Sequence, residues 1–300
     1  YTWTFGDDTP PVQTQVATVN HIYSQDGIYS LSLAVFDGTD TTTETATVTV
    51  SNVEPSVLIS PTFTGVEGVA LEFEAQAADP GEDTLRFSWN FGDGSDVVVT
   101  QDPATSHVYA DNGVYVLTLN VEDGAEQSVL RTSLVTIENV NPVTMAGQDA
   151  SVDEGSSLDF RGSAQDVEAD QLTYCWNFAD GTPDVCEQNT SHTYADNGVY
   201  DVTLTVTDDD EGQHTDTVEF TVNNIAPSPD AGENLDGIEG TAISFEATAT
   251  DPGDDELTYC WDFGDNSEVV CVQNASHVYT QEGQYTATLT VNDDDGAQRT

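Results

Sequence analysis

The chain has 300 residues, with four basic residues against fifty-five acidic ones and a formal net charge of −51. So negative a protein repels nucleic acid and anionic membrane surfaces, which excludes both as partners. Hydrophobic residues make up 37% of the sequence and aromatic residues 9%, and their periodic recurrence excludes the disorder typical of acidic, aromatic-poor chains. No segment resembles a transmembrane span or a signal peptide. The charge indicates a protein from a saline environment, a protein that binds cations, or both.

Landmark residues recur along the chain and indicate tandem repeats. The tryptophans follow one another at spacings of 86, 87 and 85 residues: Trp3, Trp89, Trp176 and Trp261. A junction ending in proline recurs as NVEP, NVNP and NIAP at residues 52–55, 139–142 and 224–227. We therefore expect four units: a partial repeat 1 (1–52), repeat 2 (55–139), repeat 3 (142–224) and a partial repeat 4 (227–300) that lacks its final strand. Because both end units are partial, we expect this sequence to be a segment of a longer tandem array.

Each repeat alternates polar and apolar residues over short runs, as in Val199–Val206 and Tyr285–Val291. This period of two, with many Val, Thr and Tyr residues, predicts half-buried strands. Turn sequences interrupt the runs, for example at 79–83, 91–94 and 110–113, and no segment has convincing helical periodicity. The pattern predicts an all-β chain, an array of antiparallel β-sandwiches with about seven strands each.

Two further features favour an immunoglobulin-like sandwich. The tryptophan lies within one strand, where that fold buries a Trp. Later in the repeat, Asp-x-Gly-x-Tyr ends at Tyr115 and again at Tyr200, which is the spacing of a tyrosine corner. We therefore expect Trp89 and Trp176 to be buried and the tyrosine hydroxyls to bond to the backbone.

The four cysteines occur as two pairs, each flanking a tryptophan and a turn: Cys175 with Cys186, and Cys260 with Cys271. The corresponding positions in the other repeats carry no cysteine on either side, so the cysteines appear only together. A hairpin closed by the turn makes the two positions cross-strand neighbours, close enough for a disulfide. Disulfides Cys175–Cys186 and Cys260–Cys271 are favoured over a metal site or free thiols, and they indicate an extracytoplasmic, oxidising setting.

The motif W-[DN]-F-G-D-G, followed by H-x-Y and then G-x-Y with a period-two strand, resembles the PKD (polycystic kidney disease) domain. Near-complete copies stand at Trp89–Gly94 and Trp261–Asp265, and the resemblance covers all four repeats. Ala179 replaces the first turn glycine in repeat 3, and Asn266 replaces the second in repeat 4. The resemblance implies an immunoglobulin-like fold, an extracellular location and no catalysis.

Acidic and amide residues gather where an immunoglobulin-like sandwich brings its entry segment, B–C loop and F–G turn together. The B–C loops carry Asp79, Glu82 and Asp83 in repeat 2, and Asp166, Glu168 and Asp170 in repeat 3. Calcium prefers six to eight hard oxygen ligands, and PKD domains of bacterial collagenases are similar and bind calcium at this end. We predict calcium sites with these principal ligands: Asp79 and Asp123; Asn141, Asp166 and Asp208; Asn224, Asp251 and Asp293. Solvated acidic loops, or aspartates required by the turns, are the alternatives.

Patterns typical of catalysis are absent, including Gly-x-Ser-x-Gly, His-Glu-x-x-His and the P-loop. The four histidines that precede strand tyrosines are interpreted as packed or turn-bonding residues, and we expect no enzyme. Two sequons mark Asn189 and Asn274 as candidate glycosylation sites.

The first functional hypothesis is a calcium-stiffened, semi-rigid stalk or filament of a cell-surface protein or adhesin. Its partners are the neighbouring repeats of a longer chain. The alternative is an accessory module of a secreted protease or polysaccharide hydrolase that binds surface polysaccharide or protein. Self-assembly by strand donation to an open sandwich edge is a third hypothesis.

Overall fold

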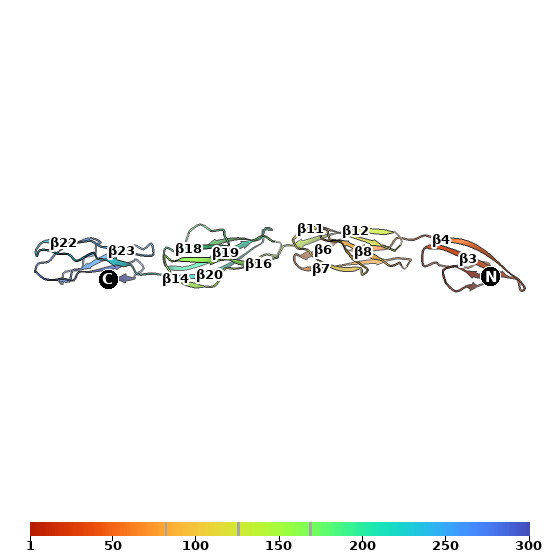
Figure 1. Ribbon diagram of the computed structural model, residues 1–300, viewed down its shortest axis with the longest axis horizontal. Helices are drawn as coiled ribbons and strands as arrows, with labels where there is room; N and C mark the ends of the chain where they lie inside the picture. The colour runs from red at the N-terminus through yellow and green to blue at the C-terminus, as the bar shows by residue number, and fades with distance from the viewer. Residues whose placement is uncertain (82, 125–126, 168–169) are drawn as a thin grey trace. The chain divides into compact units, whose positions relative to one another are not determined.

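The computed structural model describes residues 1–81, 83–124, 127–167 and 170–300. All regular elements among them are strands (Figure 1), so the all-β prediction is confirmed. The chain divides into two compact units, which are described separately: unit 1 contains repeats 1 and 2, and unit 2 contains repeats 3 and 4. The described residues form three hydrophobic clusters, one each in repeats 2, 3 and 4. These three repeats therefore have cores of their own.

Repeat 2 shows both sheets of the sandwich. One has the strand order β10-β7-β5 and the other β6-β12-β11-β8-β9. The bounds in chain order are β5 Ser56–Ile59, β6 Thr62–Val66, β7 Ala70–Ala78, β8 Arg86–Asn90, β9 Val98–Thr100, β10 Ala104–Val108, β11 Gly113–Glu122 and β12 Ser128–Glu138. Buried residues alternate with more exposed ones along β11, because successive side chains of a strand point to opposite faces of the sheet.

Repeat 3 repeats this arrangement with a four-stranded sheet, β14-β20-β19-β17, and two strand pairs, β13-β16 and β15-β18. Gly162 separates β15 from β16, where repeat 2 has the continuous strand β7. The bounds are β13 Val143–Met145, β14 Ala150–Asp153, β15 Ser157–Arg161, β16 Ser163–Gln165, β17 Thr173–Asn177, β18 Asn189–Thr193, β19 Gly198–Thr207 and β20 Gln213–Asn223.

The terminal repeats contain the same elements in part. Repeat 1 is one sheet in the order β2-β1-β3-β4, with β1 Thr2–Thr4, β2 Val12–Gln13, β3 Gly27–Phe36 and β4 Thr41–Val50. Repeat 4 has the sheet β24-β26-β27 and the pairs β21-β23 and β22-β25. Its strands are β21 Ser228–Asp230, β22 Ala242–Phe245, β23 Thr248–Thr250, β24 Thr258–Asp262, β25 Ala275–Val278, β26 Thr288–Asn292 and β27 Gln298–Arg299.

Two strand pairings differ from the purely antiparallel sandwich that the sequence predicted. Strand β6 pairs in parallel with β12, and β14 pairs in parallel with β20. In repeat 2 the chain passes from β5 in one sheet to β6 in the other through Ser60 and Pro61. Pro61 has no N–H to donate to a ladder, so the entry strand breaks there. Its second half crosses to the opposite sheet and lies beside the last strand.

Trp89 and Trp176 are buried as predicted, and so is Trp261, whereas Trp3 of the partial repeat 1 is only partly buried. Trp89 and Trp176 are 0% exposed and Trp261 is 1% exposed. The indole N–H of Trp176 donates to the Gln188 carbonyl at 3.4 Å, which satisfies its one polar group. A buried donor without a partner would be costly, so this bond allows the large side chain to fill the core.

The tyrosine corners are also present. The hydroxyl of Tyr115 donates to the Asp111 carbonyl at 2.8 Å, and that of Tyr200 donates to the Asp196 carbonyl at 3.0 Å. These bonds join the start of the long strands β11 and β19 to the preceding turn. The immunoglobulin-like prediction is therefore confirmed in its details.

The recurring histidines are packing residues. Each ring stacks on the phenylalanine of the turn motif, with centroids 3.8 to 4.1 Å apart, in the pairs Phe5–His21, Phe91–His107, Phe178–His192 and Phe263–His277. The Nε2 atom of each histidine lies 2.5 to 2.7 Å from the aspartate of the same turn. The histidine thus connects its strand to the turn beside the tryptophan.

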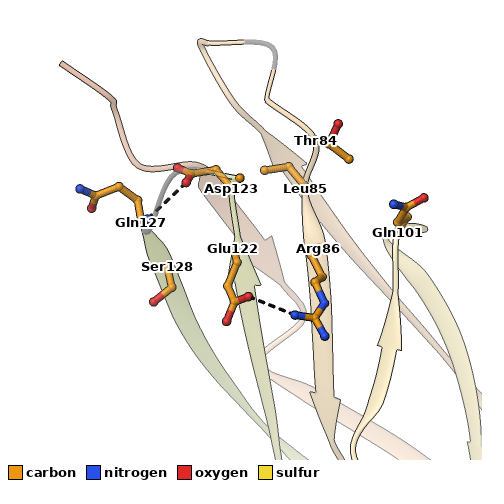
Figure 2. Close-up of a pocket in the computed structure, with 9 residues that line it drawn as sticks. Thr84, Leu85, Arg86, Gln101, Glu122, Asp123, Gln127 and Ser128 are labelled. Carbon is orange, nitrogen blue, oxygen red and sulfur yellow. Dashed lines mark hydrogen bonds and ion pairs between the residues drawn. The ribbon is translucent and has the colours of Figure 1, made fainter. Parts of the chain in front are cut away.

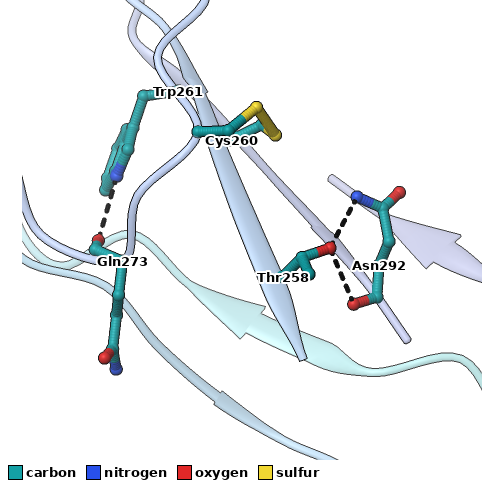
Figure 3. The surroundings of a disulfide bond; sticks show 6 residues. Thr258, Cys260, Trp261, Gln273 and Asn292 are labelled. Carbon is teal, nitrogen blue, oxygen red and sulfur yellow. Dashed lines mark hydrogen bonds between the residues drawn. A yellow bond between two sulfur atoms is a disulfide. The ribbon is translucent and has the colours of Figure 1, made fainter. Parts of the chain in front are cut away.

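Both expected disulfides, Cys175–Cys186 and Cys260–Cys271, are formed. Figure 3 shows the second one beside Trp261, whose indole N–H donates to the Gln273 carbonyl at 3.1 Å. Each bond lies within one hairpin of one repeat. Disulfides persist in oxidising compartments, so the protein is suited to a location outside the cytoplasm.

The first glycine of the turn motif adopts a left-handed backbone conformation, with φ +72° at Gly264. A Cβ there would lie 2.4 Å from the carbonyl oxygen of Thr286. Repeat 3 has Ala179 at this position and keeps φ 63°. Left-handed geometry costs a residue with a Cβ about 1–2 kcal/mol, so repeat 3 contains local strain.

We expect Ala179→Gly to raise the free energy of unfolding of repeat 3 by about 1 kcal/mol, since the gain exceeds the flexibility added to the unfolded chain. Gly264→Ala should lower that of repeat 4 by a similar amount or more. Hydrogen–deuterium exchange of peptides from each repeat measures both changes separately. Equal protection of repeat 3 in the wild-type protein and Ala179→Gly would contradict this expectation.

Candidate calcium sites at the repeat ends

The loops that were predicted to meet at one end of each repeat are joined by hydrogen bonds. In repeat 4, the side-chain amide of Asn224 in the linker donates to Asp293 at 3.2 Å. Asp294 in the turn after β26 accepts the backbone N–H of Glu256 at 3.0 Å. The linker, the loop before β24 and the turn after β26 therefore converge, as the sequence indicated.

Repeats 2 and 3 show matching bonds. The Asn52 amide donates to Asp123 at 2.9 Å. Asp209 accepts the backbone N–H of Gln171 at 2.8 Å. The convergence is thus a property of the repeat rather than of one copy.

The first aspartate of the turn after the long strand has a structural role. Asp208 and Asp293 are each 5% exposed. Asp208 accepts the backbone N–H of Gly212 at 2.7 Å, and Asp293 accepts that of Ala297 at 2.7 Å. The turn itself therefore requires these aspartates, in agreement with one of the alternatives to metal binding. The other oxygen of Asp293 accepts the side-chain amide of Asn224 in the linker.

A three-carboxylate cluster lies in unit 2 where repeat 3 meets repeat 4. Glu154, Asp251 and Asp255 each place one carboxylate oxygen within 4.8 Å of the other two. Asp251 was predicted as a ligand and Asp255 lies in the same predicted loop. Glu154 was not predicted, because it belongs to the turn after β14 of the preceding repeat. We call these three residues the joint cluster.

Several oxygens at this end are buried and have no hydrogen-bond donor among the described residues. In unit 2 these are Oε2 of Glu154, Oδ2 of Asp251, Oδ2 of Asp255 and Oδ1 of Asn224. Glu154 is 2% exposed. Buried polar atoms in folded proteins nearly always have a partner, and these four have none among the described residues.

The electrostatics of the joint cluster are unfavourable without a cation. Burial, followed by the charges of Glu154 and Asp251, raises the pKa of Asp255 to about 6. The pKa of Glu154 is raised chiefly by burial. A buried carboxylate beside other carboxylates favours its protonated form, whereas a divalent ion would neutralise the group at neutral pH.

The donors fit calcium better than other common metals. They are carboxylate and amide oxygens, the hard ligands of calcium and magnesium, without the cysteine or histidine that zinc prefers. Calcium accepts flexible arrangements of six to eight oxygens, which suits ligands from three separate loops. Glu154, Asn224, Asp251 and Asp255 would hold the ion, and its role would be structural.

A similar group lies within repeat 3, where Asp166, Asp170 and Asp208 place oxygens within 4.8 Å of one another. In repeat 2, Oδ2 of Asp79 and of Asp83 is buried without a described donor. Burial, then the charge of Asp79, raises the pKa of Asp83. Burial and like charge therefore act on the acidic loop of repeat 2 as they do on the joint cluster.

The structure does not support Asn141 as a ligand, and it does not describe two further predicted loop residues. Asn141 has an exposed side chain, whereas the NVNP alignment makes Asn139 the counterpart of Asn52 and Asn224. A buried oxygen is found on Asn139 rather than on Asn141, so the structure favours Asn139 as the linker residue of this type. Glu82 and Glu168, the remaining loop carboxylates, lie outside the described residues.

A groove on repeat 2 lies beside the turn that contains Asp123 (Figure 2). Arg86 and Glu122 line it and form an ion pair at 3.7 Å. Both side chains are largely exposed, so the pair contributes little to stability. The groove places one of the chain's four basic residues next to the acidic end of repeat 2.

The two sequon asparagines, Asn189 and Asn274, are exposed. Asn189 begins β18, and Asn274 accepts the backbone N–H of Ala247 at 3.3 Å. Both side chains are accessible at the surface, and their glycosylation stays a prediction. Among the described residues no helix is long and apolar enough to cross a membrane.

Comparison with known proteins supports the family indicated by the turn motif. The chain is 28% identical over 213 residues to the pre-pro-metalloprotease PrtV of Vibrio cholerae, covering 70% of this chain and 22% of that protein. It is 25% identical over 165 residues to human polycystin-1, covering 55% of this chain and 4% of that protein. Chitinase A of Pseudoalteromonas piscicida is 31% identical over 135 residues, covering 43% of this chain and 16% of that protein. This chain therefore spans a small part of each relative.

The PKD domain model matches four successive regions, residues 1–51, 52–137, 139–222 and 224–300. The second, third and fourth matches begin at the junction asparagines, so the linkers that were expected to separate the repeats are included in the match that follows each of them. Because these regions cover almost the whole sequence, the chain belongs to the PKD domain family.

Proposed function

We propose that this chain is a non-catalytic spacer in an extracellular or cell-surface protein, and that calcium bound at the repeat ends stiffens it. Tandem sandwiches with short linkers would form a semi-rigid stalk whose partners are the neighbouring repeats. The two disulfides support a location in an oxidising compartment. The high negative charge suits a milieu rich in cations.

The observation that carries this proposal is the joint cluster. Its three carboxylates each place an oxygen within 4.8 Å of the other two, and each has a buried oxygen without a donor among the described residues. The chain's four basic residues are Arg86, Arg131, Arg161 and Arg299, and among the described residues none forms an ion pair with the cluster. Solvated acidic loops would direct their oxygens to water, whereas these oxygens are buried. A cation would satisfy them and relieve their mutual repulsion.

We expect calcium to raise the melting temperature of the full chain. Stabilisation by a ligand follows RT ln(1 + [L]/Kd), so about a hundredfold excess over Kd adds about 2.7 kcal/mol per site. Extracellular modules bind calcium at about 10⁻⁴–10⁻³ M, so the titration should extend to about 10 mM. Calorimetric melting and isothermal titration are performed after chelation, at fixed high sodium chloride to screen non-specific attraction.

Asp251→Asn is the test variant, and Asp159→Asn, an exposed acidic position in β15 of repeat 3, is the matched control. The first should weaken calcium binding and the second should leave it unchanged. Absence of binding heat in the wild-type protein, together with an unchanged melting temperature, would show that the acidic loops are solvated surface.

A second function, an accessory binding module of a secreted hydrolase, is favoured by the names of two relatives, a metalloprotease and a chitinase. Repeat 2 also has apolar side chains on the exposed face of β11 and β12, where Val116 pairs with Leu134. Co-sedimentation of the chain with insoluble chitin or collagen separates the two functions. A spacer stays in solution, and a binding module is retained by one of the solids.

A further inference from the structure

We infer that Glu154 is a ligand that repeat 3 donates to the calcium site of repeat 4, so that one ion binds both repeats. This inference rests on the proposed calcium binding. It adds that the ion is held by two neighbouring domains and couples their orientation, rather than stabilising loops of one domain.

The backbone of Glu154 is fixed by its own repeat. Its N–H donates to the Asn223 carbonyl at 3.1 Å, and the N–H of Gly155 donates to the Tyr194 carbonyl at 2.9 Å. The turn after β14 is therefore tied to the end of β20 and to the segment that follows β18. From this support the side chain extends toward repeat 4.

The carboxylate of Glu154 has two different environments. Oε1 accepts the backbone N–H of Ile225, in the linker to repeat 4, at 2.6 Å. Oε2 is buried without a described donor and belongs to the joint cluster with Asp251 and Asp255. One oxygen thus orients the side chain and leaves the other directed at carboxylates of the next repeat. At neutral pH a cation between these carboxylates would offset their burial and their mutual repulsion.

The backbones of the two repeats approach closely beside this carboxylate. Asp254 in repeat 4 donates its N–H to the Ala195 carbonyl of repeat 3 at 2.7 Å. Gly155 has φ +68°, and a Cβ there would lie 2.4 Å from the Pro252 carbonyl oxygen. Glycine after the glutamate is therefore required for the contact that brings Glu154 to the loop of repeat 4.

The same pair of residues recurs in the sequence. Glu-Gly stands at equivalent places in three repeats, beginning at Glu67, Glu154 and Glu239, while the other two Glu-Gly pairs, at Glu211 and Glu282, lie elsewhere in their repeats. In unit 1, Glu67 is 1% exposed and accepts the backbone N–H of Val140, in the linker that follows repeat 2, at 2.6 Å. This bond corresponds to that between Glu154 and Ile225. In both repeats the glutamate therefore accepts a backbone N–H of the linker that follows. This repeated bond is expected for a ligand directed at the next repeat.

The test uses the full chain with Glu154→Gln, which keeps the shape and the acceptor for Ile225 but removes the charge. Glu239→Gln is the matched control, because this glutamate has the same place in repeat 4 and is exposed. Calcium titration should show one site weakened about tenfold or more in Glu154→Gln and no change in Glu239→Gln. Glu154→Asp, with the charge retained on a shorter side chain, should give an intermediate affinity.

Coupling is measured separately with spin labels on cysteines that replace the exposed residues Thr217 and Ser244. The native cysteines are all in disulfides, so labelling is selective under non-reducing conditions. Calcium should narrow the distribution of distances between the two spin labels in the otherwise wild-type chain, and it should not do so when Glu154→Gln is added. Equal affinity and equal narrowing in both would overturn the inference while calcium binding itself stands. Absence of calcium binding to the wild-type chain would instead overturn the proposed function.

Discussion

Trp176→Ala should lower the free energy of unfolding of repeat 3 by about 3–5 kcal/mol, the range for loss of a large aromatic side chain from a core. The side chain is 0% exposed, and its ring centroid lies 5.4 Å from that of Phe160. Its removal would leave a cavity between the sheets and also break the bond to the Gln188 carbonyl. Small domains have only about 5–15 kcal/mol of stability in total, so repeat 3 should be close to unfolding at physiological temperature.

The effect should be confined to the repeat that is changed. The cluster around Trp176 contains only residues of repeat 3, and the cluster around Trp89 contains only residues of repeat 2. Hydrogen–deuterium exchange of the full chain should therefore show lost protection in repeat 3 and unchanged protection in repeat 2. Trp176→Phe, which fills part of the space, should cost less. Equal loss of protection in repeat 2 would mean that the repeats do not fold as separate cores.

Much of the fold was predictable because the residues that define it recur. Trp89 and Tyr115 have counterparts in Trp176 and Tyr200, and a spacing found several times is strong evidence for one structure. The left-handed geometry of Asn266, at φ 63°, was also predictable, since asparagine tolerates that region. The parallel pairing of β6 with β12 was not predictable, because alternation along a strand shows which face is buried but not the direction of its partner.

The candidate site was predicted in part, for a related reason. Asp251 and Asn224 stand in loops that the immunoglobulin-like topology is known to bring together, so their convergence followed from the fold. Glu154 belongs to the opposite end of the preceding repeat. A prediction made within a single domain could not place it at the site of repeat 4. The recurrence of Glu-Gly at the same place in three repeats, at 67, 154 and 239, is the signal that could have indicated it. The role of this glutamate is recognised only from the contacts between repeat 3 and repeat 4.

The second large effect concerns the hairpin disulfides. Replacement of both Cys260 and Cys271 by serine should lower the free energy of unfolding of repeat 4 by about 2–3 kcal/mol, because a cross-link over a short loop reduces the entropy of the unfolded chain. The pair Cys175 and Cys186 should have a similar effect on repeat 3. Urea unfolding with repeat-resolved hydrogen exchange measures each change.

Geometry explains why these positions accept a disulfide. Trp261 and Val270 exchange two backbone hydrogen bonds, at 2.9 and 3.0 Å, and form a hydrogen-bonded pair. The next pair along the hairpin, Cys260 and Cys271, is therefore a non-hydrogen-bonded pair, in which the Cα atoms of antiparallel strands lie closer together. Their Cα separation is 4.0 Å. The bond therefore joins positions that the hairpin already holds side by side.

Repeat 2 provides the control, because Ser88 and Val99 pair in the same register without cysteines. Reductant should lower the stability of repeats 3 and 4 and leave repeat 2 unchanged. Ser88→Cys with Val99→Cys should form a new disulfide and raise the stability of repeat 2 by about 2–3 kcal/mol. If the new cysteines stay reduced under oxidising conditions, or if reductant affects repeat 2 of the wild-type chain, the hairpin register is not what determines disulfide formation. If the two new cysteines form a disulfide, the hairpin accepts this cross-link wherever both cysteines are present. Wild-type repeat 2 folds without such a bond.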